Sequence, residues 1–294
     1  MGSPSSVSAF TLKIVAIVGM TCNHVANIFA LQMPGWLTVA LCSLGGLTFP
    51  IMAFLLDEGY RHTSNIRKYA KRLAIFALVA QVPYSLLWGA TANVLITLLL
   101  GLGVLWADDH LGRGHFALVF GGALVVSVWC DWGVIGPLMI YLFHRLREEG
   151  VRKAIGLTML MAALALAPPA IGDLTSAINH GGAPEQGDAT RELVTETPDN
   201  VAALEVDSPW EVLAETPSTL APAGSEPLYS VMDAGAIVGN LGALGYATIG
   251  FGLAAVLLMQ YRGRRGRPLK WFFYCYYPAH LMLLWAVAQV VFSP

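Results

Sequence analysis

The sequence predicts an all-α protein, a polytopic bundle of about nine transmembrane helices. Three observations predict this fold. Apolar residues make up 56% of the 294 residues and charged residues only 12%, against about 25% charged in soluble domains. The mean hydropathy is +0.61. The apolar residues gather in long runs, and inside lipid a helix satisfies every backbone polar group of such a run.

Nine apolar segments can be drawn as helices, since about 20 residues span a bilayer and fewer suffice where packing or water helps. They cover residues 11–31, 36–56, 70–88, 91–107, 116–130, 132–144, 153–172, 233–259 and 271–291. Several connecting loops are very short, so neighbouring helices are expected to be antiparallel. Residues 1–172 therefore hold seven helices, and residues 232–294 hold two more.

The basic residues are strongly segregated along the chain. With the N-terminus in the cytoplasm, all 17 Lys and Arg residues except Arg191 fall on the cytoplasmic side, as the positive-inside rule predicts. The same count decides the structure of residues 116–144. Two short helices joined by a turn at 130–133 keep Arg113 and Arg145 on one side, which a single long helix would not.

Residues 173–231 differ from the rest of the chain. They are acidic, rich in Pro, Ala and Thr, and almost free of aromatic residues, which is typical of irregular or disordered segments. We expect a disordered insert on the outer, extracytoplasmic face. It can be a lid, a docking segment for an acceptor or an idle linker.

One stretch, residues 45–73, organises the rest of the sequence. It starts apolar, ends cationic, and has a polar hinge predicted at residues 57–63. Its motifs read TFP at 48–50, FLL at 54–56 and EGYRHT at 58–63. This pattern resembles the signature of the TraX family, membrane acetyltransferases associated with N-terminal acetylation of conjugative pilin. The DWG run at 131–133 and the FFYCYYPAHL run at 272–281 also resemble stretches of that family.

Two histidines fall inside predicted helices, His24 in the first and His280 in the last. Ionisable residues inside a membrane are costly, so they are candidates for function. A histidine with a pKa near 6.5 can take a proton from an attacking amine or hydroxyl and release it later. The bland alternative is a neutral imidazole that hydrogen-bonds across helices. The resemblance implies His24 as general base, with Asn23 or His280 polarising the carbonyl group; Asn23 stands where the family has Asp.

The resemblance also implies acetyl-CoA as the acyl donor, made in the cytoplasm. Its phosphates need several cations with shape-fixing donors. The residues assigned to this donor site are Arg61, His62, Lys68, Lys71, Arg72 and Tyr277. Positive-inside topology alone would explain the cations without any ligand. The four cysteines show no metal-binding spacing, and the basic clusters lie beside the membrane, so we expect neither a metal nor nucleic acid.

The sequence thus predicts an integral acetyltransferase of the bacterial inner (cytoplasmic) membrane. It would move an acetyl group from acetyl-CoA to an amine or hydroxyl acceptor, a pilin N-terminus or an envelope glycan. Two alternatives stay open. Histidines near the midplane and helices interrupted by glycine also suit a membrane transporter. A non-enzymatic pilus assembly factor could use the acidic insert as a docking arm. Binding of acetyl-CoA would separate the first hypothesis from both others.

Overall fold

The computed structural model describes residues 7–180, 236–267 and 270–292. These residues form helices and no β-strand, which confirms the all-α prediction. Five of the described helices are long and apolar enough to cross a membrane: Ala9–Gln32, Gly35–His62, Ile66–Trp88, Val151–Gly172 and Val238–Met259. The protein is therefore a multi-pass membrane protein. Residues 181–231 of the predicted insert lie outside the described residues.

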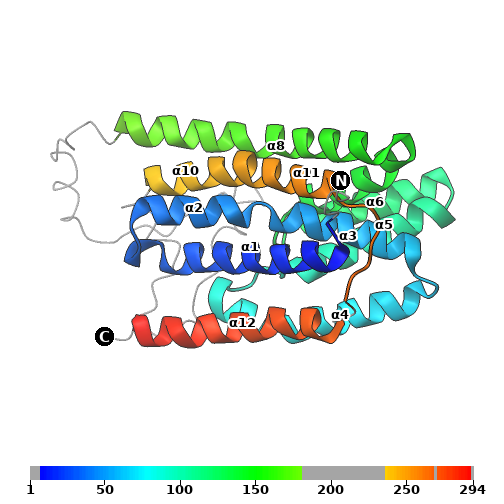
Figure 1. Cartoon of the computed structure of the whole chain (residues 1–294), viewed down its shortest axis with the longest axis horizontal. Helices are drawn as coiled ribbons and strands as arrows, with labels where there is room; N and C mark the ends of the chain where they lie inside the picture. The colour runs from blue at the N-terminus through cyan, green and yellow to red at the C-terminus, as the bar shows by residue number, and fades with distance from the viewer. Residues whose placement is uncertain (1–6, 181–235, 268–269, 293–294) are drawn as a thin grey trace, which may run out of the picture.

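The helices lie side by side along one axis (Figure 1). They are α1 (Ala9–Phe29), α2 (Gly35–Gly45), α3 (Thr48–His62), α4 (Ile66–Trp88), α5 (Val94–His110), α6 (Arg113–Ser127), α7 (Ile135–Leu146), α8 (Val151–His180), α10 (Ala236–Gly245), α11 (Phe251–Met259) and α12 (Lys270–Val291). With α2–α3 and α10–α11 each counted as one interrupted helix, the described residues form nine helices, the number that was predicted. Helix α10 packs between α8 and α2, while α1 contacts α2, α3 and α12.

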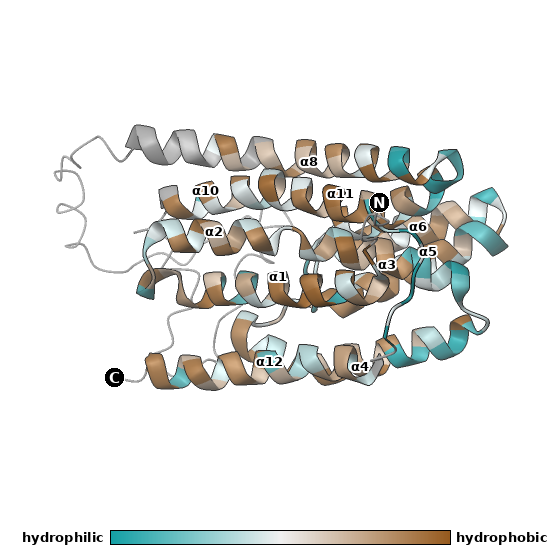
Figure 2. Ribbon diagram, in the orientation of Figure 1, coloured by the Kyte–Doolittle hydropathy of each residue, from teal (hydrophilic) through white to brown (hydrophobic). Residues whose placement is uncertain are grey.

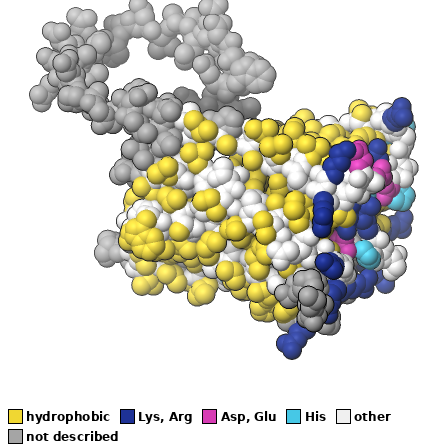
Figure 3. Space-filling model, turned by 45° about the horizontal axis from the view of Figure 1, so that its top comes forward, with side chains coloured by type: hydrophobic (Ala, Val, Ile, Leu, Met, Phe, Trp, Pro, Cys, Tyr) yellow, Lys and Arg dark blue, Asp and Glu magenta, His cyan; other side chains and the backbone are white. Residues whose placement is uncertain are grey.

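Polar residues gather at one end of the bundle, as Figure 2 and Figure 3 show. This charged end is where α3, α5 and α7 finish and where α4 and α8 begin. Lys, Arg, Asp, Glu and His side chains lie there together, whereas the rest of the visible face is mostly apolar. The segregation of basic residues seen in the sequence is thus a segregation in space.

The polar hinge predicted at residues 57–63 is wrong, because α3 continues as a helix through His62. Its polar side chains are compatible with a helix since they find partners on neighbouring elements, and Asp57 also pairs with Arg61 one turn later. The segment predicted as one helix at 36–56 is interrupted instead at Gly46 and Leu47. The helix predicted at 153–172 is also longer than expected, since α8 continues to His180.

The interruption between α2 and α3 faces an irregular turn of the helix α10–α11. Residues Tyr246–Gly250 form a π-helical turn, η4. A Cβ atom on Gly46 would lie 2.2 Å from the carbonyl oxygen of Tyr246, and one on Gly250 would lie 2.6 Å from the Cα of Gly46. The two backbones therefore touch, which only glycine permits, and the sequence prediction of a glycine-rich, close-packing helix agrees with this contact.

The predicted turn between two short helices is present between α6 and α7. Helix α7 has 12 residues, roughly 18 Å at 1.5 Å per residue, so the turn before it ends well inside the bundle. The backbone N–H of Asp131 donates to the carbonyl of Ala92 at 2.7 Å. Trp132 has a positive φ of 91°, which is rare for a bulky residue, and its ring stacks on Phe49 at 4.0 Å.

Candidate active site

His24 of α1 and His280 of α12 are hydrogen-bonded to each other in the interior of the bundle. His24 Nδ1 lies 2.8 Å from His280 Nε2, and both residues are 6% exposed. His280 Nδ1 lies 3.0 Å from the carbonyl oxygen of Tyr276. A carbonyl only accepts, so His280 Nδ1 carries a proton. When both rings are neutral, His280 Nε2 then accepts from His24 Nδ1–H, and His24 Nε2 keeps a free electron pair.

Aromatic side chains hold this histidine pair in place. The ring of Trp88 lies 5.0 Å from that of His24, and the ring of Tyr276 stacks on His280 at 5.0 Å. The Tyr276 hydroxyl is 2.7 Å from Thr21 Oγ1. Thr21 donates to its own helix, at the carbonyl of Ile17, so Tyr276 donates to Thr21. The hydrogen-bonded chain thus fixes α12 against α1 at the level of the pair.

A small cavity of about 30 Å³ opens beside His24. By the size of a water molecule, it has room for a group of one or two heavy atoms. Its lining includes Met20, Asn23, His24, Gly45, Thr48, Phe49, Met52, Val94, Asp131, Trp132 and Tyr246. The α6–α7 turn therefore brings a carboxyl group, Asp131, into the same cavity as the imidazole. From the sequence, Asp131 was placed in the turn and in the DWG run that resembles the TraX family, but it was not assigned to a site.

Asn23 lies in this cavity as well, against the end of α2. A Cβ atom on Gly45 would lie 2.6 Å from the Cβ of Asn23, so the absence of a side chain at Gly45 makes room for it. Tyr277, assigned from the sequence to the donor site, also lies here rather than at the charged end. Its ring is 6.4 Å from that of His24, and its buried hydroxyl lies near the backbone of Val94.

At the charged end, the fully buried carboxylate of Asp57 is surrounded by cations. Arg61 Nε donates to its Oδ1 at 2.9 Å, and Arg147 Nη1 donates to its Oδ2 at 3.1 Å. His144 Nδ1 lies 2.8 Å from Oδ1. Arg61 also donates to the carbonyl oxygen of His144 at 2.6 Å. These contacts join α3 to α7 and to η2 (Arg147–Glu149).

The same network extends to Glu58 and Asp109. Arg147 donates to Glu58, which also accepts from the Tyr261 hydroxyl at 3.1 Å. Burial acts against the charged guanidinium of Arg147, yet its bonds to Glu58 and Asp57 raise its pKa above the usual value. Burial likewise acts to raise the pKa of Asp109, but hydrogen bonds from Tyr60 and His144 outweigh it and lower that pKa.

The network is balanced in charge. His144 Nε2 lies 3.3 Å from Asp109 Oδ1 and its Nδ1 lies 2.8 Å from Asp57 Oδ1, and Arg61 Nη2 also lies 3.2 Å from Nδ1. The two carboxylates favour the protonated, cationic form of the ring. The three carboxylates are Asp57, Glu58 and Asp109, and the three cations are Arg61, Arg147 and His144. Asp108, Asp109 and His144 place possible metal-ligand atoms within 4.8 Å of one another. Asp109 and His144 of this group also belong to the ion-pair network around Asp57.

The structure does not bring the six predicted donor-site residues together. Arg61 is engaged by Asp57, and His62 Nδ1 lies 2.8 Å from the Glu58 carbonyl oxygen. Lys68 and Lys71 are exposed on α4. Arg72 lies over the Tyr69 ring, 6.0 Å from its centroid. Five of these residues lie at the charged end, whereas Tyr277 lies beside His24 in the interior of the bundle.

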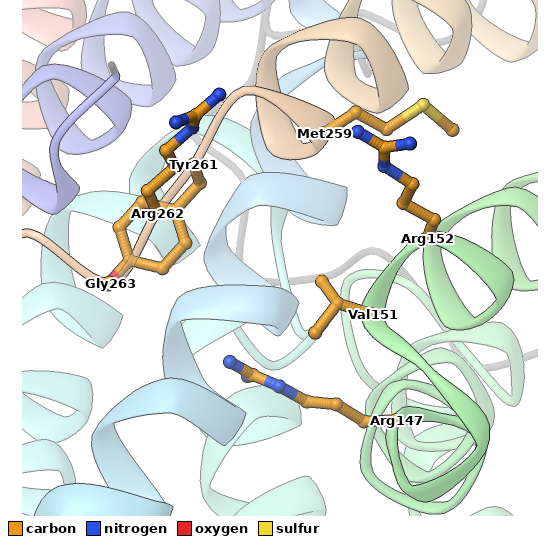
Figure 4. Close-up of a pocket in the computed structure, with 7 residues that line it drawn as sticks. All are labelled: Arg147, Val151, Arg152, Met259, Tyr261, Arg262 and Gly263. Carbon is orange, nitrogen blue, oxygen red and sulfur yellow. The ribbon is translucent and has the colours of Figure 1, made fainter.

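A second, larger cavity of about 370 Å³ lies at the charged end (Figure 4). Its lining residues are Arg147, Val151, Arg152, Met259, Tyr261, Arg262 and Gly263. In the sequence these arginines contribute to the positive-inside pattern and were assigned to no site. They come from two segments more than 100 positions apart in sequence, 147–152 and 259–263. Nothing in their local spacing indicates that they meet.

Comparison with known proteins gives the family. The TraX protein family model matches residues 8–180, more than half of the chain. A curated relative from Dichelobacter nodosus, named "Probable fimbrial assembly protein FimC, serogroup H1", is 33% identical over 174 residues, which are 54% of this chain and 70% of the relative. No solved structure matches the chain. The chain belongs to the TraX family.

Proposed function

We propose that this protein is a membrane acyltransferase that moves an acetyl group from acetyl-CoA to an amine, with His24 as general base. The hydrogen-bonded pair of His24 and His280 is the observation that carries this proposal. A buried histidine with a purely structural role is expected to have both ring nitrogens hydrogen-bonded. Here His280 is fixed in one tautomer by a backbone carbonyl, and His24 is left with a free electron pair at Nε2.

The transfer needs one proton to move twice. His24 Nε2 removes a proton from the attacking amine as its nitrogen forms a bond to the thioester carbon. His280 Nε2, which accepts from His24 Nδ1, stabilises the imidazolium formed in this step. The carbon–sulfur bond then breaks, and His24 returns the proton to the departing CoA thiolate. General base catalysis of this kind contributes roughly 10²- to 10⁴-fold to a rate. The pair gives His280 a positioning role in place of the carbonyl-polarising role expected from the sequence.

The cavity beside His24 favours an amine acceptor over a hydroxyl. Asp131 carries a carboxyl group into the cavity, and the rings of Trp132 and Tyr246 line it. A carboxylate beside aromatic faces attracts a cationic ammonium group more strongly than a neutral alcohol. An amine arrives protonated at neutral pH, so Asp131 attracts it, takes this extra proton and releases it to water after each turnover. His24 then takes the proton that the neutral amine loses as it attacks the thioester. Asn23 supplies an amide that can hydrogen-bond the thioester carbonyl.

The curated relative bears on the acceptor and on location. Its printed name describes a fimbrial assembly protein, and fimbriae are built from pilin subunits. A pilin N-terminus carries the kind of amine that Asp131 would attract, so we propose pilin as the acceptor. The donor, acetyl-CoA, is made in the cytoplasm. The charged end then faces the cytoplasm, in the inner membrane of a bacterium, in agreement with its excess of basic residues.

The test measures acetyl transfer by the full chain in lipid nanodiscs. Purified protein is mixed with acetyl-CoA and a peptide that has a free N-terminal amine. The CoA thiol that is released is measured with a colorimetric thiol reagent. The matched control is the same peptide with its amine already blocked. Thiol release that requires the free amine supports the proposal. Binding of acetyl-CoA without thiol release, for amine and hydroxyl acceptors alike, contradicts it.

An assembly role without catalysis is the second candidate, favoured by the printed name of the relative. On that hypothesis the protein binds pilin and releases no thiol, whatever the state of His24. A transporter would move a solute across sealed vesicles in the absence of acetyl-CoA. The same purified protein serves all three measurements.

A further inference from the structure

We propose that the cavity bordered by Arg152 and Arg262 binds the phosphate groups of the CoA donor, in place of the α3–α4 cations. This inference rests on the proposed function for the identity of the ligand. It rests on four features of the described residues: the volume of the cavity, its three arginines, its apolar faces and the start of a long helix. None of the residues assigned to the donor from the sequence lines this cavity.

The arginines differ in how far their charge is already compensated. Arg147 is held by Asp57 and Glu58. Arg152 and Arg262 are exposed and form no ion pair with any residue that the structure describes. The neighbouring acids are engaged elsewhere, since Glu149 pairs with Lys153 and Glu148 lies 3.8 Å from Arg145. The positive charges of these two guanidinium groups, on opposite sides of the cavity, are therefore not compensated by a described carboxylate and are available to an anionic ligand (Figure 4).

The start of α8 adds backbone donors to these two side chains. Helix α8 has 30 residues and begins at Val151, directly after Gly150 in a positive-φ conformation of 126°. The first amide groups of a helix have no partner within it and point out of its end, where they favour anions. Arg152 lies in this first turn, so its side chain and the amides can serve one phosphate.

The remaining walls suit the rest of a nucleotide. Val151 and Met259 present apolar side chains that are 37% and 43% exposed. Tyr261 contributes an aromatic ring, fixed by its hydroxyl on Glu58 and by an edge contact with Phe54 at 5.7 Å. A volume of about 370 Å³ is in the range of small-molecule pockets. Arginine in particular matches phosphate oxygens with a planar pair of donors.

The cavity is also at a suitable distance from His24. Met259 borders this cavity and Tyr246 borders the one beside His24. Both belong to the helix α10–α11, 13 residues apart, which is roughly 20 Å at 1.5 Å per residue. An extended phosphopantetheine arm has about this length. The α4 lysines, by contrast, lie on the helix that packs on α5 and α12, away from α8 and α11.

The experiment uses adenosine 3′,5′-bisphosphate, the phosphorylated half of CoA without its thiol, and the full chain in nanodiscs of zwitterionic lipid. Calorimetry should show saturable binding. Arg152→Gln and Arg262→Gln should each weaken it about tenfold, the typical effect of one charge-assisted bond, and the pair should abolish it. The matched control is Lys68→Gln with Lys71→Gln, which should bind as the unaltered chain does. Both arginines are exposed and lack ion pairs with described residues, so the melting temperature should not change.

Three results would overturn the proposal. They are no binding of the bisphosphate to the unaltered chain, unchanged binding in the arginine pair, or loss of binding in the lysine pair. An anionic lipid headgroup offers similar chemistry, so the measurement is repeated with phosphatidylglycerol in the nanodiscs. Binding of that lipid in an Arg152-dependent manner, without bisphosphate binding, would assign the cavity to lipid and overturn the donor assignment.

The proposed function can fail separately. If the bisphosphate binds through Arg152 and Arg262 but no acetyl transfer occurs with any acceptor, the cavity is a nucleotide site and the acyltransferase proposal falls. If acetyl transfer occurs and the KM for acetyl-CoA is unchanged in Arg152→Gln, the acyltransferase proposal stands and the cavity is not the donor site.

Discussion

The network around Asp57 at the charged end and the His24–His280 pair differ in how many of their hydrogen-bonding groups lack a partner. At the charged end, three carboxylates meet three cations, and each ring nitrogen of His144 faces an acceptor. Beside the small cavity, His24 has one hydrogen-bond partner and one free electron pair. The first region is complete as it stands. The second has capacity left for a substrate.

This difference teaches where to look for chemistry in a membrane bundle. Burial of polar groups is common to both regions, so burial alone would select Asp57 as readily as His24. A compensated network holds helices together, because its groups are costly to expose one at a time. Groups with unused donors or acceptors beside a cavity are the better candidates for catalysis. The following substitutions test this distinction, from the largest expected effect to the smallest.

His24→Ala should lower the rate of acetyl transfer by about 10²- to 10⁴-fold, because it removes the general base. Binding of acetyl-CoA should remain, since no phosphate contact is lost. His115→Ala is the matched control, because His115 is exposed at the start of α6. Initial rates and calorimetry measure both effects. A His24→Ala protein with an unaltered rate would remove His24 from the mechanism.

Asp57→Ala should lower the free energy of unfolding by about 3–5 kcal/mol, because it leaves Arg61, Arg147 and His144 without their shared carboxylate. Titration with SDS in mixed micelles measures this free energy. Glu149→Ala removes an exposed ion pair with Lys153 and should change it by less than about 1 kcal/mol. Equal losses in the two variants would show that the network at the charged end is not structural.

His280→Leu should lower kcat about tenfold and leave KM unchanged, because His24 loses the acceptor that orients its ring. His280→Gln keeps an acceptor oxygen near the same place and should recover part of the rate. A structural role alone would not distinguish the two variants in this way. Identical kcat values for Leu and Gln would argue against the positioning role of His280.

Tyr60→Phe should produce the smallest effect, and one that depends on pH. The bond from Tyr60 helps to lower the pKa of Asp109 below its unfolded value of about 3.9. A carboxyl with a lowered folded-state pKa stabilises the fold above the unfolded pKa, and this stability is lost as pH falls through the folded-state pKa. The variant should therefore have a slightly lower melting temperature than the unaltered chain at pH 6. This difference in melting temperature should shrink as the pH falls below 4. A difference in melting temperature that stays constant from pH 6 to pH 3 would be the contrary result.

Much of the fold follows from local sequence, and the exceptions have a common cause. Hydrophobic runs and the basic count predicted the helices and the turn at 130–133, and the cost of burying histidine selected His24 and His280. The predicted hinge at 57–63 failed because Glu58 has its partner, Tyr261, 203 positions away. No local pattern shows such a contact. Asp57 and Arg61, by contrast, have the i,i+4 spacing of a helical ion pair. This spacing in the sequence favours a continuous helix over a hinge.

The site was predicted less completely than the fold for the same reason. Asp131 reaches the cavity only because α7 is short and the turn before it ends inside the bundle. A carboxyl group within a predicted apolar region was a usable signal, since such groups are expensive there. Arg152 and Arg262 offered no such signal, because basic residues beside a membrane are expected for topology. Their convergence depends on α11 packing against α8.

The backbone contact between Gly46 and the turn at Tyr246–Gly250 has a consequence for biogenesis. Helices α2 and α8 are synthesised before α10, which packs on both. Ribosomes add about 5–20 residues per second, so the 55 positions from 181 to 235 delay α10 by roughly 3–11 s. During that interval Cys42, Ser43 and Gly46 lack the glycines of the later helix, Gly242, Gly245 and Gly250, against which they pack. Helix α10 therefore enters late between two helices that are already in the membrane, and a residue larger than glycine at position 46 would clash with the backbone of Tyr246 at this step.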